Sequence, residues 1–432
     1  MMTNSKLLTI LSDTFGQLPD SRTGNNGRYT ICDAALGAFG VFFTQSRSFL
    51  AYQRDMQQRK GRNNARSLFG IEQIPSDPQI RNLLDPIAPV HLRAPFWTIL
   101  ELLEQEGRLA SDYQFAGGWL CSLDGTQYFS STKIHCPDCT VAVRAETTWY
   151  SHTVLIPALV MPGKAEVIVL EPEFITPQDG AEKQDCERNA AKRWIMRNAA
   201  QFTGRRVTIL ADDLYCNQPF CELLLAQGLD FILTCKPTSH TTLYEEVELL
   251  AKAGGVAQIE DRRWTGKWYE RRTYRYVNHV PLCADPKALL VNWCELTVVN
   301  ETTGEALYHN AFATNHDLKE STVRTTVTAG RTRWKIENET NNVLKNHGYH
   351  LEHNFGHGQQ HLASVLLMLI LLAFLFHTVL QLYDQTYQRV RAALATRKTF
   401  FDDIRALTRY WFFESWEHLL DFMFTQLELV PH

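Results

Sequence analysis

The order of strand-like and helical patterns between Trp119 and Pro237 is the feature that most constrains the fold. Strand-like runs come first. Strands and helices then alternate, with a helix expected over Glu187 to Ala200 and a strand within RRVTILADDLY, Arg205 to Tyr215. Strands followed by such an alternation are typical of an α/β sheet. We therefore predict an α/β domain that begins near residue 116.

The segments on either side of this region have a different character. Residues 1 to 115 have helical periodicity, and residues 236 to 315 resemble antiparallel strands joined by Thr-Gly turns. The chain is again helical from about residue 319 to its end. We expect the strand-rich stretch to be a β-rich insertion within the α/β domain.

Composition excludes few functions. Of the 432 residues, 45% are hydrophobic and 21% charged, as in ordinary globular proteins. The net charge of −4 means that a nucleic-acid partner would have to be bound by local basic patches. Ten scattered cysteines without a secretory signal favour the cytoplasm. The apolar run VLLMLILLAFLF (365 to 376) is shorter than the roughly 20 residues of a membrane span, so we expect a core or partner-facing helix and no membrane.

Acidic residues follow two of the predicted strands. Asp124 ends the first strand, and Asp212 and Asp213 follow the strand of Val207 to Leu210. Such positions face the crevice where open α/β sheets bind ligands, although Asp is also a common turn residue. Glu337 lies on a later helix that Trp334 and Ile336 are expected to dock on the sheet. Three convergent carboxylates require a cation, and paired divalent ions suit displacement at phosphorus.

Three motifs carry a family resemblance. They are LDGTQYF, which contains Asp124, ILADDLY, which contains Asp212, and TRWKIEN, in which three residues separate Arg333 from Glu337. Through them the chain resembles a DDE-type insertion-sequence transposase, in the IS-four-like branch with a Tyr-Arg-Glu-Lys signature. Two positions depart from the signature. Its Tyr falls on Gly330, and Lys345 comes one residue late. Glu339 is a second candidate acid, but it lacks the Arg spacing.

The resemblance implies an RNase H-like catalytic domain in two parts, residues 116–235 and 316–360, interrupted by the insertion at 236–315. It also implies a helical DNA-binding domain at 1–115 and a helical C-terminal region at 361–432. Two Mg²⁺ (or Mn²⁺) ions would be held by Asp124, Asp212 and Glu337, with Asp213 as the alternative to Asp212. The implied reaction cleaves the element's terminal inverted repeats and joins them to target DNA, with a homodimer pairing the two ends.

Other protein classes stay open. A catalytically decayed or domesticated DNA-binding protein of the same fold is the alternative that Gly330 and the displaced Lys345 leave open. A glycosidase with paired carboxylates is disfavoured by the Arg333 to Glu337 spacing and by the basic and aromatic residues of the insertion.

Several basic and aromatic residues are candidate DNA contacts. Their cations could bind phosphates, and their aromatic rings could stack on bases. The candidates are Arg59, Lys60 and Arg62 in a loop, Trp264, Trp268, Arg271 and Arg272 in the insertion, and Arg333 and Lys345 near the acid. The competing interpretations are a solvated loop and a hairpin whose aromatic rings face the core. For Lys192, Arg193 and Arg197 we expect a solvated helix face.

The cysteines and histidines permit a structural zinc site. Cys136, Cys139 and His152 have a C-x2-C-x12-H spacing, but tetrahedral zinc requires four ligands. The candidates for the fourth are Cys121, His135 and Cys186. Because none is obvious, we favour a free cysteine pair. The later set His350, His353, His357 and His361 is expected to be internally satisfied or to face DNA, with metal binding the less favoured interpretation.

Overall fold

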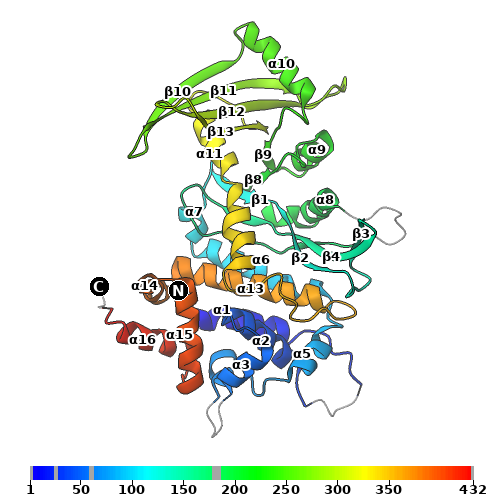
Figure 1. Cartoon of the computed structure of the whole chain (residues 1–432), viewed down its shortest axis with the longest axis vertical. Coiled ribbons are helices and arrows are strands. Elements are labelled where there is room, and N and C mark those ends of the chain that lie inside the picture. Colours follow the sequence, from blue (N-terminus) through cyan, green and yellow to red (C-terminus); the bar gives the residue numbers. More distant parts are fainter. Residues whose placement is uncertain (1–2, 24–27, 58–62, 178–185, 430–432) are drawn as a thin grey trace.

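The computed structural model describes residues 3–23, 28–57, 63–177 and 186–429. The protein is elongated, with the first and last helices gathered at one end and the strands between residues 257 and 314 at the other (Figure 1). The α/β region lies between these two ends. The structure thus shows the mixture of a large sheet and many helices that the sequence predicts.

The N-terminal region is helical. Its elements are α1 (Asn4–Phe15), α2 (Ile31–Phe43), α3 (Phe49–Met56), α4 (Asn64–Phe69), α5 (Asp77–Leu84), the 3₁₀ helix η1 (Pro89–Leu92), α6 (Ala94–Gln105) and α7 (Arg108–Asp112). Thr30 begins α2 with a capping box, in which its hydroxyl accepts from the Asp33 N–H.

The strands form two sheets. They are β1 (Gly118–Ser122), β2 (Gly125–Ser131), β3 (Thr140–Arg144), β4 (Thr147–Leu155), β5 (Ala158–Val160), β6 (Ile168–Val169), β7 (Glu173–Ile175), β8 (Arg206–Ala211), β9 (Asp230–Thr234), β10 (Ala257–Trp264), β11 (Tyr269–Pro281), β12 (Leu290–Asn300) and β13 (Ala306–Thr314). Nine form one sheet in the order β10-β11-β12-β13-β9-β8-β1-β5-β6, and β2, β4, β3 and β7 form the other. Strands β1, β8 and β9 are parallel, whereas β5 and β13 join this trio antiparallel.

The remaining helices complete the chain. They are α8 (Glu187–Asn198), the 3₁₀ helix η2 (Ala199–Phe202), α9 (Gln218–Ala226), α10 (Thr241–Lys252), α11 (Val323–Arg331), the π-helix η3 (Ile336–Asn341), α12 (Asn342–Asn346), α13 (Leu362–Tyr383), α14 (Gln385–Ala393), α15 (Arg397–Tyr410) and α16 (Trp416–Gln426).

The segment 236–315 differs in two respects from the simple β-rich insertion expected from sequence. It begins with α10, and its four strands continue the α/β sheet because β13 pairs with β9. Trp293 and Cys294 on β12 are completely buried, so this part of the sheet shares the hydrophobic core.

Helix α13 contains the apolar run at 365 to 376. By length and composition it could cross a membrane, but 94% of its most apolar window is buried inside the protein. It packs against α2, α5, α6 and α14 and against β6. This agrees with a core helix, and the apolar length alone is weak evidence for a membrane.

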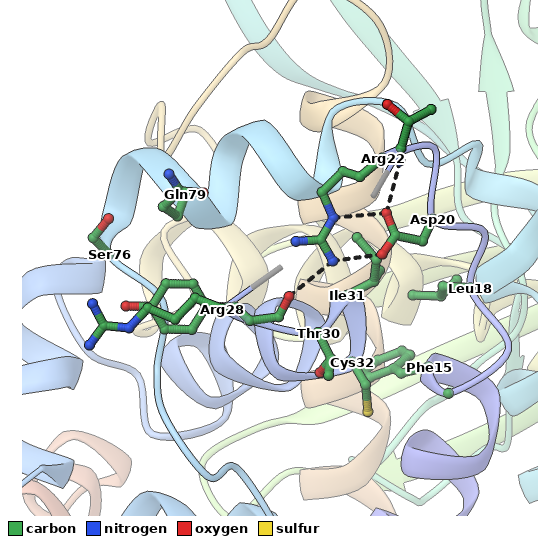
Figure 2. Close-up of a pocket in the computed structure, with 13 residues that line it drawn as sticks. Phe15, Leu18, Asp20, Arg22, Arg28, Thr30, Ile31, Cys32, Ser76 and Gln79 are labelled. Atoms are coloured by element: carbon green, nitrogen blue, oxygen red, sulfur yellow. Dashed lines mark hydrogen bonds and ion pairs between the residues drawn. The ribbon is translucent and has the colours of Figure 1, made fainter. Parts of the chain in front are cut away.

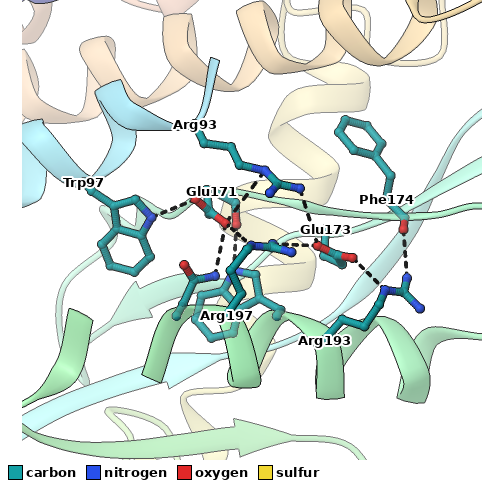
Figure 3. A network of polar contacts seen from close by, with 9 residues as sticks. Arg93, Trp97, Glu171, Glu173, Phe174, Arg193 and Arg197 are labelled. Atoms are coloured by element: carbon teal, nitrogen blue, oxygen red, sulfur yellow. Dashed lines mark hydrogen bonds and ion pairs between the residues drawn. The ribbon is translucent and has the colours of Figure 1, made fainter. Parts of the chain in front are cut away.

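A network of charged side chains joins α8 to the strand region (Figure 3). The buried Glu171 carboxylate accepts from Trp97 at 2.8 Å, from Arg197 at 2.9 Å and from Asn198 at 3.1 Å. Arg193 pairs with buried Glu173 at 2.9 Å. The expectation of a merely solvated face for Arg193 and Arg197 is therefore wrong, because buried carboxylates require such partners.

Candidate active site

Asp124 and Asp212 follow neighbouring parallel strands. In the register of β1 with β8, Ser122 lies opposite Leu210, and each aspartate comes two residues after its strand's member of that pair. Adjacent strands are about 4.8 Å apart, so both carboxyl groups belong to the same edge of the sheet. Both residues are half-buried. The topology thus brings together two acids that are far apart in sequence.

Asp124 lies in surroundings that disfavour its charged form. Burial, followed by the charge of Glu187, raises its pKa from 3.8 to about 7, and Glu337 and Asp212 add to this while Arg333 opposes it. The side-chain amide of Asn341 donates to its Oδ2 at 2.8 Å. The positive charge of Arg333 therefore does not offset the combined effect of burial and the neighbouring acids on the pKa of Asp124.

Glu187 is a fourth acid at this site, and sequence reasoning did not identify it. Its Oε1 accepts from the Gly125 N–H at 3.0 Å and from the Tyr215 hydroxyl at 2.6 Å. Burial and Glu187 raise the pKa of Tyr215 well above its usual value, so the phenol stays protonated and donates. Glu187 therefore bridges the segments that follow Asp124 and Asp212. The available signal was its position as the first residue of a predicted helix, where carboxylates are favoured.

Glu337 lies on η3, and π-helical turns frequently occur at functional sites. Its Oε1 is 2.7 Å from Nη2 of Arg333, and half of the Glu337 side chain is exposed. Ile336 is completely buried, but Trp334 is 45% exposed, so only Ile336 anchors this segment as expected. The predicted docking by Trp334 is wrong. Lys335 is buried instead of Trp334, and its ammonium group donates to the carbonyl of Lys164.

The carboxylates do not form one compact cage in this conformation. Within the described parts of the chain, every set of three or more potential ligand atoms that all lie within 4.8 Å of one another consists of cysteines and histidines. The charges of Asp212 and Glu337 nevertheless both raise the pKa of Asp124. The arrangement is that of neighbouring acids, with Arg333 bound to the outermost one.

Asp213 faces a different part of the structure from Asp212. Its carboxylate accepts from the Lys236 N–H at 2.7 Å and the Ser239 hydroxyl at 2.5 Å, and it lies 3.4 Å from Nε2 of His240. The carboxylate of Asp212 accepts only a local bond, from the Leu214 N–H at 2.9 Å, among the described residues. These contacts favour Asp212 as the site acid and give Asp213 a role in holding the loop after β9.

Gly330 stands where the resemblance would place a tyrosine, and the packing explains the glycine. A Cβ atom there would lie 2.8 Å from the Phe312 ring and 2.9 Å from Ile232. A cavity of about 250 Å³ opens beside it, lined in part by Arg333, Trp334 and Tyr308. Space thus exists next to Gly330, but α11 lies too close to the sheet for a side chain at this position.

The predicted DNA contacts fall into three sets. Arg59, Lys60 and Arg62 lie outside the described residues. Lys345, on α12, pairs with Glu352 at 2.9 Å. Arg333 is engaged with Glu337.

The β10–β11 hairpin carries the third set, and its outer end is aromatic and basic. Trp264 is 54% exposed and packs on Tyr269. Arg271 is exposed and forms no ion pair with a described residue, whereas Arg272 pairs with Glu270 at 2.8 Å. Trp268 is partly buried, and Lys267 lies over its ring. The alternative of aromatic rings facing the core therefore does not hold for Trp264.

The structure assembles the cysteines and histidines differently from the expectation. Cys136, Cys139 and His152 lie together, and the residue that joins them is His357. Of the expected fourth ligands, Cys121 is buried in β1, His135 stacks on Tyr150 and Cys186 is exposed before α8. His357 belongs to the histidine set for which metal binding was the less favoured interpretation.

A separate pocket lies in the N-terminal helical region (Figure 2). Arg22 pairs with Asp20 at 2.6 Å on one side, and Arg28 and Ser76 line another. None of its lining residues belongs to the carboxylate site. It therefore contributes nothing to the assignment of the acids.

Comparison with known families adds to this geometry. Residues 180–375 match the family model of the transposase DDE domain. The match supports a DDE-type transposase. The matched segment contains Glu187, Asp212 and Glu337, whereas Asp124 precedes it. No curated protein matches the chain.

A transposase DDE domain associates the chain with DNA transposition and insertion sequences, and it implies a nuclease or transferase that binds DNA. Such transposases use divalent metal ions. The oxygen donors beside Asp124 suit this requirement, because carboxylates and amide oxygens are the ligands that hard divalent cations prefer. The buried Oδ1 of Asn341 has no hydrogen-bond partner among the described residues, which is a further oxygen available at the site.

Proposed function

We propose that this protein is the transposase of an insertion sequence, in the IS-four-like branch with a Tyr-Arg-Glu-Lys signature. It cleaves the ends of its element and joins them to target DNA. The observation that carries the proposal is the placement of Asp124 and Asp212 after adjacent parallel strands, with Glu337 close enough to raise the pKa of Asp124. The parallel strands β1, β8 and β9, with β5 antiparallel beside them, support an RNase H-like catalytic domain.

Asp124, Asp212 and Glu337 would hold two Mg²⁺ (or Mn²⁺) ions, for which their oxygen atoms and uncompensated charge are suited. Bound divalent ions would activate an attacking hydroxyl and stabilise the charge that develops on the phosphate. Asn341 orients Asp124 through its amide, and Glu187 positions the two strand ends through Gly125 and Tyr215.

Arg333 has a second role in this proposal. In the free protein it neutralises Glu337 at 2.7 Å. A DNA phosphate entering the site would offer the guanidinium a new anionic partner, since arginine binds phosphate with two parallel hydrogen bonds. Transfer of Arg333 to phosphate would release the Glu337 carboxylate for cation binding at the moment when substrate is present.

The DNA itself would be bound by local patches. The exposed Trp264 and Arg271 at the end of the β10–β11 hairpin offer a ring for base stacking and a cation for phosphate. We further propose that a homodimer pairs the two element ends and that the protein works in the cytoplasm, at the nucleoid.

The decisive experiment is a nicking assay on DNA that carries the element's terminal repeats, with purified protein and Mg²⁺. We expect cleavage that requires Mg²⁺ and is abolished in Asp124→Ala and Glu337→Ala. Glu339→Gln is the matched control, because Glu339 lies on the same π-helix but lines a different pocket. Unchanged nicking in both acid variants would refute the site. DNA binding without nicking by the wild type would favour the decayed DNA-binding protein.

A further inference from the structure

Four side chains converge on one point away from the carboxylates. Cys136 and Cys139 lie in the turn between β2 and β3, His152 lies on β4, and His357 comes from the loop before α13. All four are at least nine-tenths buried. Their potential ligand atoms all lie within 4.8 Å of one another. The cluster therefore unites segments that are 205 residues apart between the two histidines.

Five of the six distances among the four ligand atoms match those of a tetrahedral zinc site, and all four atoms lie within 4.8 Å of one another. The two sulfur atoms are 3.9 Å apart, and Nε2 of His152 is 3.5 Å from each of them. Nε2 of His357 is 3.6 Å from Cys139 Sγ and 3.1 Å from Nε2 of His152. Tetrahedral zinc with Zn–S of about 2.3 Å and Zn–N of about 2.0–2.1 Å requires edges of about 3.8 Å for S–S, about 3.5 Å for S–N and about 3.3 Å for N–N.

Hydrogen bonds around His357 hold its ring and its loop in an orientation suited to metal binding. Its Nδ1 lies 3.0 Å from the Gly358 carbonyl, so Nδ1–H donates there and Nε2 keeps its lone pair toward the cluster. The loop itself is held by Asp85, whose carboxylate accepts from the backbone N–H groups of Gln359, Gln360 and Leu362 at 3.0–3.1 Å. Two imidazole nitrogens at 3.1 Å repel each other unless a proton or a cation lies between them. Because two sulfur atoms face the same point, a metal cation satisfies all four groups.

We infer that Cys136, Cys139, His152 and His357 form a structural Zn²⁺ site. Two thiolates and two imidazoles in a tetrahedron select zinc over Mg²⁺ or Ca²⁺, which prefer oxygen ligands. With four protein ligands no position is left for substrate, so the site is structural.

The zinc site lies between two segments that lead to the acidic residues. Strand β2 starts directly after Asp124 and leads to Cys136 and Cys139, while His357 follows Glu337 by 20 residues. A bound zinc ion would therefore fasten the segment that contains Asp124 to the segment that contains Glu337, on either side of the insertion. This assignment stands independently of the proposed transposition chemistry, because no residue is shared with the carboxylate site.

The test is the metal content of the full chain, purified without a polyhistidine tag from zinc-supplemented cells. Inductively coupled plasma mass spectrometry should find about one zinc per chain. The zinc should be lost in Cys139→Ser and His357→Ala but retained in Cys294→Ser, a control at another buried cysteine. X-ray absorption on the wild type should show two sulfur and two nitrogen neighbours. His357→Cys should keep the metal and show three sulfur atoms, which separates loss of a ligand from loss of folding.

Three results would overturn the inference. The first is wild-type protein that binds no zinc after incubation with Zn²⁺. The second is a Cys136–Cys139 disulfide, detected by mass spectrometry as thiols that resist alkylation until reduced. The third is undiminished zinc in His357→Ala, which would place the metal elsewhere. Metal content and absorption spectra decide the matter without a nicking assay, so failure of the zinc site and failure of the proposed function are distinguishable.

Discussion

Substitution of Asp124 by asparagine should stabilise the metal-free protein at neutral to alkaline pH. The folded pKa of Asp124 is raised from 3.8 to about 7. A carboxyl group with a raised folded pKa favours the folded state while it is protonated, and this advantage is lost as the pH rises from the unfolded to the folded pKa. Above about pH 7 the ionised Asp124 destabilises the folded state relative to the fully protonated form. The pKa difference of about 3 units corresponds to about 4 kcal/mol, at 1.36 kcal/mol per unit.

The Asn341 amide can still donate to an asparagine oxygen at position 124, so Asp124→Asn removes the charge with little change of shape. We expect the difference in unfolding free energy, variant minus wild type, to increase by about 2–3 kcal/mol between about pH 5 and about pH 8. Urea denaturation at 25 °C in the presence of a chelator would measure it. Mg²⁺ at about 100 times its dissociation constant should then stabilise the wild type by about 2.7 kcal/mol and the variant less.

Asp213→Asn is the matched control for this measurement. The Asp213 carboxylate accepts two hydrogen bonds from the loop after β9, so its neutralisation should weaken the fold and leave the Mg²⁺ effect intact. The reasoning is refuted if Asp124→Asn shows no pH-dependent gain over the wild type. It is also refuted if Mg²⁺ stabilises Asp124→Asn as strongly as the wild type.

Three further substitutions test other parts of the structure. Gly330→Ala should lower stability by about 1–3 kcal/mol, because its Cβ would lie 2.8 Å from the Phe312 ring; an unchanged urea midpoint would contradict this packing. Arg197→Ala should cost about 2–3 kcal/mol by removing a cation from buried Glu171, and adding Glu171→Gln should recover part of the loss in the same denaturation assay. Arg271→Ala should weaken DNA binding and reduce the salt dependence of the affinity by about one phosphate contact, measured by fluorescence anisotropy at several salt concentrations; an unaltered slope would exclude this contact.

Local patterns in the sequence predicted many of the elements around the site. The expected helix over Glu187 to Ala200 is α8, which ends at Asn198, and the expected strand in Arg205 to Tyr215 contains β8. Within the helical region predicted for residues 1 to 115, however, the apolar pattern did not reveal the break between α2 and α3. Ser48 caps α3 by accepting from the Ala51 N–H, a local bond that the continuing apolar pattern conceals.

Residues that need a distant partner could not be found in this way. Sequence reasoning could not identify Glu187 as a site residue, because its partners Gly125, on β2, and Tyr215, in the turn after β8, are distant in the sequence. His357 was grouped with its sequence neighbours, although its Nε2 lies beside Cys139 and His152, which are distant in the sequence. Neither long-range contact leaves a periodic signal in the local sequence.

The sequence by itself determined the chemical groups and their local positions: Asp124 and Asp212 after strands, Arg333 four residues before Glu337, and the Cys136–Cys139 pair. Such features depend on neighbours along the chain, where the geometry of strands, helices and turns is known in advance. Only the tertiary structure decided which groups meet. The parallel register of β1 with β8 joins the two aspartates, and packing of the loop before α13 brings His357 to the cysteines. These long-range contacts follow from burial of the whole core, to which residues far apart in the sequence contribute together.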